Sequence, residues 1–160
     1  MPLNPLASQY LEVFKNNGEF DGGLSFQTAL QQANLDLSIE SLNRVDQLLD
    51  QVRARVKPQF DTFLGVSANQ NFLYLLCFYV GQCVAFNSRQ GIVWLQYGEL
   101  IEAFPEHKGM YPECFATSVT CLLEKTGFFI PLSSIQERLF DDPPGKSVAF
   151  SASGFLGERL

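Results

Sequence analysis

The stretch FLYLLCFYVGQCVAF, residues 72–86, carries no charged side chain. Its apolar residues fall on nearly every side of a helix, which predicts a buried core helix over about 70–87. A helix of this length spans roughly 22 Å, which is less than the roughly 30 Å of hydrocarbon in a bilayer. Gln82 interrupts the run, and amide side chains flank it. We therefore expect this helix to be surrounded by other parts of the protein, and not to cross a membrane.

Residues 39–57 predict an amphipathic helix that can cover such a core. Their apolar side chains recur every three or four positions and so share one helical face: Ile39, Leu42, Val45, Leu49, Val52 and Val56. Ser38 is placed to cap this helix. Glu40 and Arg44 are four residues apart, which predicts an ion pair on the solvated face.

The remaining pattern indicates an α+β fold. We expect further helices over 5–16, 26–33, 58–64 and 134–140, and strands over 92–95, 115–123 and 128–130. The last two strands are joined by a turn at Lys125–Gly127, which predicts an antiparallel hairpin. The architecture is therefore a helical layer around one buried apolar helix, followed by a small antiparallel sheet. We expect residues 1–160 to form a single domain, with 145–160 as an irregular arm.

Composition and charge limit the partners. The chain has 160 residues, of which 46% are hydrophobic and 18% charged, and its net charge is −6. A domain of this size buries enough surface to fold without a metal or a disulfide. Each half of the chain carries a net charge of −3, so neither half offers the basic surface that nucleic acid or an anionic membrane requires. An acidic surface favours a basic protein partner.

The four cysteines predict free thiols in a reducing compartment. Cys77 and Cys83 lie in the most apolar stretch, where cysteine usually packs as a small hydrophobic residue. The spacings of Cys77, Cys83, Cys114 and Cys121 match no zinc motif, and we expect neither a metal nor a cofactor. The first residues lack the basic and apolar regions of a secretory signal. We therefore expect a cytoplasmic protein.

Few residues suggest catalysis. His107 is the single histidine, and a nucleophile such as Cys114 would need it as a general base. We interpret His107 as a solvated loop residue, because no motif supports that pairing. Asp46 and Asp50 lie on one helical face and could act as an acid–base pair or bind a cation. We interpret them as part of the solvated face, with Arg53 close enough to offset their repulsion.

Aromatic residues near the apolar helix are the best candidates for binding. Trp94, Tyr97 and Tyr79 combine apolar area with a polar tip, as in ligand pockets and interfaces. The alternative is that a core rich in phenylalanine recruits them for packing. Arg89, just past the apolar helix and near Trp94 in the sequence, is the polar partner that we expect for such a patch, and Gln82 is the polar residue within the apolar run. These five residues are our predicted binding set.

Two segments resemble a group of uncharacterised small bacterial proteins. That group has an S-x-E-S-L-x-x-x-D helix, a G-x-Y-x-G-E helix and a short strand with tryptophan. The residues that carry the resemblance are Ser38–Leu42, Val45, Asp46, Leu48 and Leu49, then Phe78–Gln82, Arg89, Gly91 and Trp94. It covers residues 36–95, but Cys77 or Phe78 stands where the group has its first Gly, and Gln82 where it has Glu. The resemblance implies a bacterial, cytoplasmic setting and no particular activity.

Three functions follow as hypotheses. The acidic charge and the lack of a catalytic motif favour a non-enzymatic interaction protein, of an accessory or immunity type, that binds a basic partner. The alternative is a small-ligand-binding module with a pocket near Trp94. A hydrolase that uses Cys114 and His107 is the third hypothesis. A homodimer is compatible with each of them.

Overall fold

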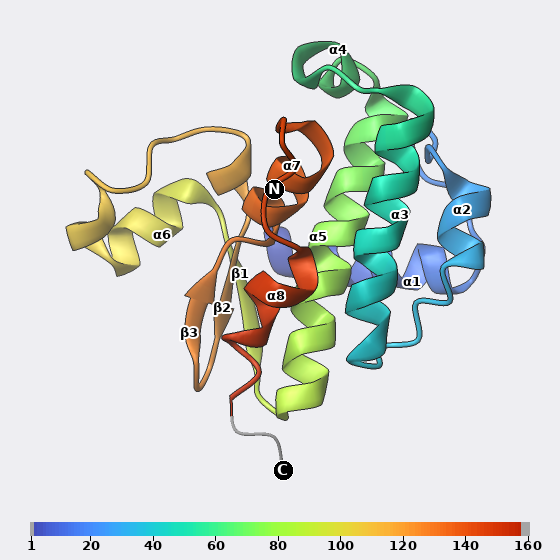
Figure 1. Cartoon of the computed structure of the whole chain (residues 1–160). Coiled ribbons are helices and arrows are strands. Elements are labelled where there is room, and N and C mark those ends of the chain that lie inside the picture. Colours follow the sequence, from blue (N-terminus) through green and yellow to red (C-terminus); the bar gives the residue numbers. More distant parts are fainter. Residues whose placement is uncertain (1, 158–160) are drawn as a thin grey trace.

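Helix α5 (Ser67–Ser88) lies at the centre of the fold, as its uncharged sequence predicts (Figure 1). The computed structural model describes residues 2–157. Helix α5 packs against α1, α3, α4, α7 and strand β1, and thirteen of its residues are buried. A helix that is apolar on all sides can exclude water only when neighbours cover every side. The other elements are therefore arranged around it.

In the part of the chain that the structure describes, five helices precede the first strand, and the three strands are followed by two more helices. The helices before the sheet are α1 (Leu3–Lys15), α2 (Gln27–Gln32), α3 (Glu40–Val56) and α4 (Phe60–Leu64). After α5 follow β1 (Ile92–Leu95), α6 (Tyr97–Ala103), the short 3-10 helices η1 (Pro105–His107) and η2 (Ala116–Ser118), β2 (Thr120–Leu123), β3 (Gly127–Phe129), α7 (Pro131–Phe140) and α8 (Val148–Ser153). The protein thus has the predicted α+β fold.

The sheet is antiparallel in the order β1-β2-β3. Trp94 pairs with Cys121, and Cys121 pairs with Phe129, so these three residues form one row across the sheet. All three are buried. Trp94 and Cys121 lie against Gly81 of α5, and the Phe129 ring stacks on Phe155. The sheet and α3 lie on different sides of α5 in Figure 1.

One prediction of local structure was wrong. Residues 115–119 do not continue β2, because Ala116–Ser118 form the 3-10 helix η2. The Thr117 hydroxyl donates to the backbone oxygen of Pro112 at 2.9 Å, which ties this turn to the preceding loop. The start of α5 is tied to the loop before α2, because the Ser25 hydroxyl donates to the side chain of Asn69.

The predicted irregular arm, residues 145–160, contains a helix. Helix α8 packs on α3 and α7, and its Val148 and Ala152 are buried in the main core. The last three residues of the arm, 158–160, lie outside the described part of the chain. The C-terminal segment is therefore part of the packing and not an appendage.

Within residues 2–157, no helix combines the length and the apolar character that crossing a bilayer requires.

Candidate functional site

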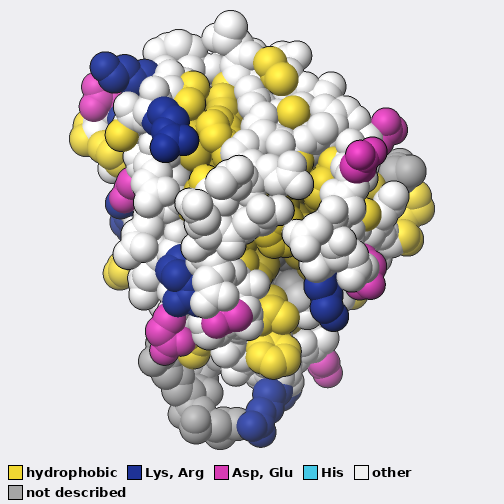
Figure 2. Space-filling model, turned by 90° about the vertical axis from the view of Figure 1, so that its right-hand side faces the viewer, with side chains coloured by type: hydrophobic (Ala, Val, Ile, Leu, Met, Phe, Trp, Pro, Cys, Tyr) yellow, Lys and Arg dark blue, Asp and Glu magenta, His cyan; other side chains and the backbone are white. Residues whose placement is uncertain are grey.

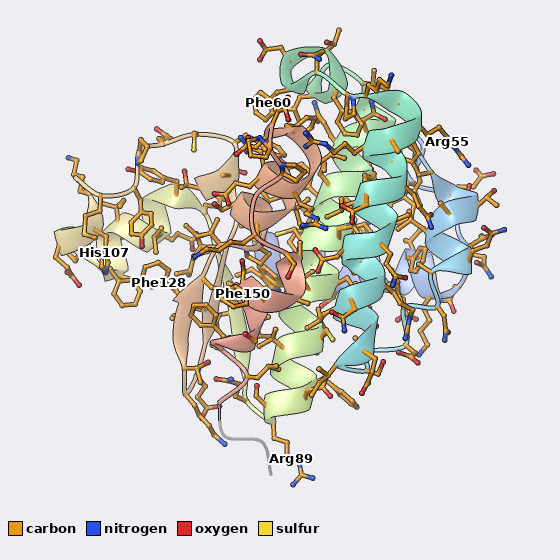
Figure 3. The ribbon with its side chains drawn as sticks, in the orientation of Figure 1. Arg55, Phe60, Arg89, His107, Phe128 and Phe150 are labelled. Atoms are coloured by element: carbon orange, nitrogen blue, oxygen red, sulfur yellow. The ribbon has the colours of Figure 1, made fainter. Side chains whose placement is uncertain are left out.

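The structure does not gather the five predicted binding residues at one site, and only Tyr79 and Gln82 line the same cavity. Trp94 belongs to the core, since only 4% of its surface is exposed. Its ring meets Phe78 edge to face, with 5.0 Å between ring centroids, and it lies directly over Gly81. Arg89 ends α5 in a left-handed conformation and points away from the body of the protein (Figure 3). These two residues do not share a pocket.

Tyr79 and Gln82 line a cavity of about 520 Å³ between α1, α2 and α5. We call it the helix cavity. Its apolar lining residues are Leu11, Phe14, Leu30, Leu35, Leu37 and Tyr79, and its polar ones are Lys15, Asn17, Gln31, Asn34, Asp36 and Gln82. Figure 2 shows the side of the molecule that carries α2, where apolar side chains are visible between uncharged polar groups. This volume is in the range of small-molecule sites.

Tyr97 lines a different cavity, of about 480 Å³, which we call the aromatic pocket. The residues that line it are Leu3, Leu6, Tyr10, Tyr74, Phe78, Gln96, Tyr97, Gly98, Glu113, Cys114, Ser118 and Val119. Trp94 is one layer below it, because Trp94 packs on Phe78. The pocket near Trp94 that the sequence suggested therefore has a physical counterpart, formed mostly by other residues.

Four aromatic rings line the aromatic pocket, those of Tyr10, Tyr74, Phe78 and Tyr97. The Tyr10 hydroxyl donates to Asn71 Oδ1 at 2.6 Å, and the Tyr97 hydroxyl donates to the backbone oxygen of Tyr111 at 2.6 Å. With these hydroxyl protons committed, the two tyrosines offer mainly ring surface. Burial raises the pKa of Tyr10 and of Tyr74, so both rings stay uncharged. Neutral aromatic rings attract cations through their electron-rich faces.

The surroundings of the aromatic pocket are acidic. Glu113 lines it, and none of the described lining residues is a lysine or an arginine. Residues 97–114 hold four glutamates and one lysine. Glu99 belongs to the capping box that starts α6, while Glu102 and Glu106 are exposed. The rings and carboxylates together form a site suited to a cationic group.

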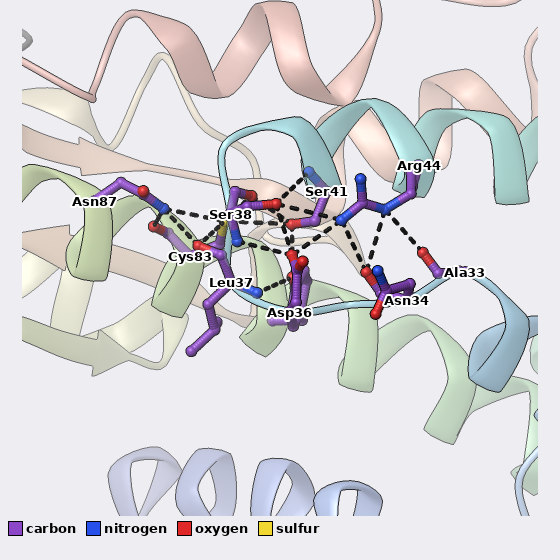
Figure 4. A network of polar contacts seen from close by, with 10 residues as sticks. Ala33, Asn34, Asp36, Leu37, Ser38, Ser41, Arg44, Cys83 and Asn87 are labelled. Atoms are coloured by element: carbon purple, nitrogen blue, oxygen red, sulfur yellow. Dashed lines mark hydrogen bonds and ion pairs between the residues drawn. The ribbon is translucent and has the colours of Figure 1, made fainter.

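A network of hydrogen bonds holds one wall of the helix cavity, the loop of residues 33–38 (Figure 4). The Arg44 guanidinium donates to the backbone oxygens of Ala33 and Asn34 and pairs with Asp36 at 2.9 Å. Arg44 thus pairs with Asp36, whereas the sequence predicted a pair with Glu40. The bonds from the Ser38 hydroxyl and backbone N–H, followed by the nearby Arg44, lower the pKa of Asp36.

The backbone of Leu37 is fixed at both polar groups. Its N–H donates to the Tyr79 hydroxyl at 2.8 Å, and its oxygen accepts a bond from Asn87 Nδ2 at 2.7 Å. The Tyr79 hydroxyl also lies 2.6 Å from Ser41 Oγ. Leu37 has φ +65°, and Asn34 has φ +51°, a region that is costly for a leucine. The surrounding bonds therefore hold a strained loop in one shape beside the cavity.

The structure gives His107 and Cys114 different neighbours. The His107 ring lies among Phe104, Tyr111 and Phe128, with centroid distances of 5.2–6.0 Å, and Figure 3 shows it next to Phe128. His107 is half-buried, so its prediction as a solvated residue was wrong. Cys114 is exposed and contacts Thr117. Within the described residues, no three histidine, cysteine or acidic side chains gather as a metal site would require.

Asp46 and Asp50 do not form a solvated pair, which corrects the prediction. Asp46 is only 7% exposed, and its two oxygens accept the backbone N–H groups of Val148 and Ala149 at 2.6 and 3.0 Å. Burial raises the pKa of Asp46, against the lowering effect of these two bonds. Asp50 forms a two-pronged pair with Arg138, at 2.8 and 2.7 Å. Asp46 therefore holds α8 on α3, and Asp50 holds α7 on α3.

Sequence reasoning missed most residues of the two cavities. Tyr10, Tyr74 and Glu113 lie in segments far apart in the chain, and only the fold brings them into one pocket. Lys15, which lines the helix cavity, carried no sequence signal of its own. A usable signal was Gln82, a polar residue in an otherwise apolar helix, and it does open on the helix cavity.

Comparisons of the chain with protein-family models, with curated proteins and with solved structures found no match.

Proposed function

We propose that this protein is a non-enzymatic interaction protein that binds a basic partner protein through the aromatic pocket. The observation that carries the proposal is the lining of that pocket: four aromatic rings and the Glu113 carboxylate, with no lysine or arginine among its described residues. An arginine or lysine side chain of the partner would place its charge against the rings and the carboxylate.

Charge outside the pocket supports the same partner. The four glutamates of residues 97–114 and the net charge of −6 would attract a basic protein and speed its association. The rings would supply the apolar area that exposed ion pairs lack, since such pairs contribute little on their own. In this proposal the chain is an accessory or immunity-type protein, and its partner is the more basic of the two.

The test is a titration of the labelled protein with a short arginine-containing peptide and with its glutamate counterpart, followed by NMR. We expect the arginine peptide alone to shift the amides of Tyr97, Glu113 and Cys114. Glu113→Gln and Tyr97→Leu should each weaken binding about twofold to fivefold. Glu102→Gln is the matched control, because it removes a glutamate of the same acidic segment that does not line the pocket. Equal losses in Glu113→Gln and Glu102→Gln would reject a pocket-specific site.

A small molecule in the same pocket is the second candidate, favoured by the volume of about 480 Å³. A thermal-shift screen with a metabolite panel separates the two. A ligand that raises the melting temperature of the wild-type protein, and not of Tyr97→Leu, would favour the small molecule.

We also propose a bacterial, cytoplasmic setting. All four cysteines are free thiols, and three of them are buried, which supports a reducing compartment. Cell fractionation of the tagged protein tests the location.

A homodimer is an alternative, in which a second copy of the chain occupies the acidic face. A solution mass twice that of the chain would favour it.

A further inference from the structure

The helix cavity is independent of the aromatic pocket and has the opposite charge character. Its apolar lining comes from α1, α2, α5 and the loop of residues 33–38, and six of its twelve lining residues are apolar. Such a mixture, an apolar floor with a few polar groups, is typical of small-molecule sites. The polar side chains of the cavity determine which polar or charged group of a ligand could bind there.

Three of the six polar side chains in the helix cavity already have partners. Asp36 accepts bonds from Ser38 and pairs with Arg44, so its charge is balanced. Gln31 donates to Asn17 at 3.3 Å. These groups shape the cavity but have less to offer a ligand.

Three polar side chains of the cavity remain uncommitted. Within the described residues, the side chains of Lys15, Asn34 and Gln82 make no hydrogen bond or ion pair, and Lys15 is the one that carries a charge. Lys15 is exposed at the end of α1, and Gln82 is half-buried in α5. The one unbalanced charge of this cavity is therefore positive, although the chain as a whole is acidic.

From this arrangement we propose that the helix cavity binds a small organic acid with an apolar chain. The alkyl or aryl body of the ligand lies against the leucines, Phe14 and Tyr79. Its carboxylate accepts hydrogen bonds from the Lys15 ammonium and the Gln82 amide. A charge-assisted bond of this kind is stronger than a neutral one, which selects an acid over an alcohol of the same chain.

The fixed loop beside the cavity supports the proposal. The Arg44 and Tyr79 bonds hold Asn34 and Leu37 in left-handed conformations. A wall that is already ordered loses little entropy when a ligand binds. Backbone strain that neighbours maintain in this way is often found at binding sites.

The probes are decanoate, 1-decanol and decylammonium, which share one alkyl chain and differ in the head group. Titrations of the full-length labelled protein, followed by NMR, should show saturable shifts at Leu37 and Gln82. We expect decanoate to bind most tightly and decylammonium least. Lys15→Met should weaken decanoate about tenfold and leave decanol unchanged. Gln82→Leu should weaken both, because its amide can bond to either head group.

Lys108→Met is the matched control, because Lys108 is exposed and does not line the cavity. It should leave the affinity for all three probes unchanged. Thermal melts of each variant verify that it is folded. The proposal is overturned if decanoate gives no saturable shift at these positions, if decylammonium binds as well as decanoate, or if Lys15→Met and Lys108→Met behave alike.

Discussion

Tyr79 illustrates, at the scale of one residue, how a predicted binding group becomes a structural one. Its ring lines the helix cavity, but only 3% of its surface is exposed. Its hydroxyl ties Leu37 in the loop of residues 33–38 to Ser41 at the start of α3. The sequence indicated an aromatic ring near the apolar helix, and it could not indicate that the polar tip would be used inside the protein.

The buried Tyr79 hydroxyl predicts a loss of stability at alkaline pH. Burial raises its pKa from 10.0 to about 12. In the unfolded chain the same group ionises near 10.0, so unfolding between these pH values releases a proton. The free energy of unfolding should therefore fall as the pH rises from about 10 to about 12.

The Tyr79→Phe variant tests this explanation. It should lower the free energy of unfolding by about 1–3 kcal/mol at neutral pH, because Leu37 N–H loses its partner. It should also show a shallower decline than the wild type above pH 10, which urea titrations at several pH values would measure. Parallel curves for the two proteins over this range would contradict the assignment.

At the scale of elements, the contact between α5 and the sheet depends on a glycine. Gly81 faces Trp94 of β1, and a Cβ atom at position 81 would come within 2.6 Å of Trp94 Cζ2 and even closer to Cη2. It would also lie 3.2 Å from Cys121 Sγ on β2. The absence of a side chain therefore lets the buried helix approach the sheet. This gives a packing reason for a residue that is unfavourable in helices.

Gly81→Ala should therefore destabilise the protein, although alanine favours helix by about 1 kcal/mol. The Trp94 ring is only 4% exposed and packs on Phe78, and overpacking of a core costs about 1–3 kcal/mol. Gly98→Ala in α6 is the control, because a Cβ there would meet no atom within 4 Å. Urea denaturation should show a loss for the first variant and none for the second. A Gly81→Ala protein as stable as the wild type would mean that α5 and β1 can separate.

At the scale of the whole molecule, Asp46 on α3 binds the start of α8, which is distant in the sequence. It accepts the first two N–H groups of α8, 102 and 103 residues further along the chain. Ser147 accepts the third, from Phe150, at 2.9 Å. The start of α8 is thus satisfied by one local and one distant side chain. The resulting packing buries Val148 and Ala152 in the same core as α5.

Asp46→Ala should release this end of the chain. Removing a charged acceptor from buried N–H groups costs about 1.5–3 kcal/mol. Hydrogen exchange at Val148 and Ala149 should accelerate more than exchange within α5. Asp50→Ala is the control, because the Asp50–Arg138 pair is partly exposed and should cost about 1 kcal/mol or less. Unchanged hydrogen exchange in α8 of the Asp46→Ala protein would show that Asp46 does not hold α8 on α3.

The sequence by itself determined the α+β class of this protein and six of its helices, but neither α6 nor α8. Those features depend on the local spacing of apolar residues, which is visible within one segment of chain, as in residues 72–86. The tertiary structure alone decided which polar and aromatic residues meet. Asp46 looked solvated until α8 covered it, and Tyr10, Tyr74 and Glu113 became one pocket only when three distant segments packed together. The physical reason is that burial and site geometry are properties of contacts between segments, which the periodicity of a single segment does not encode.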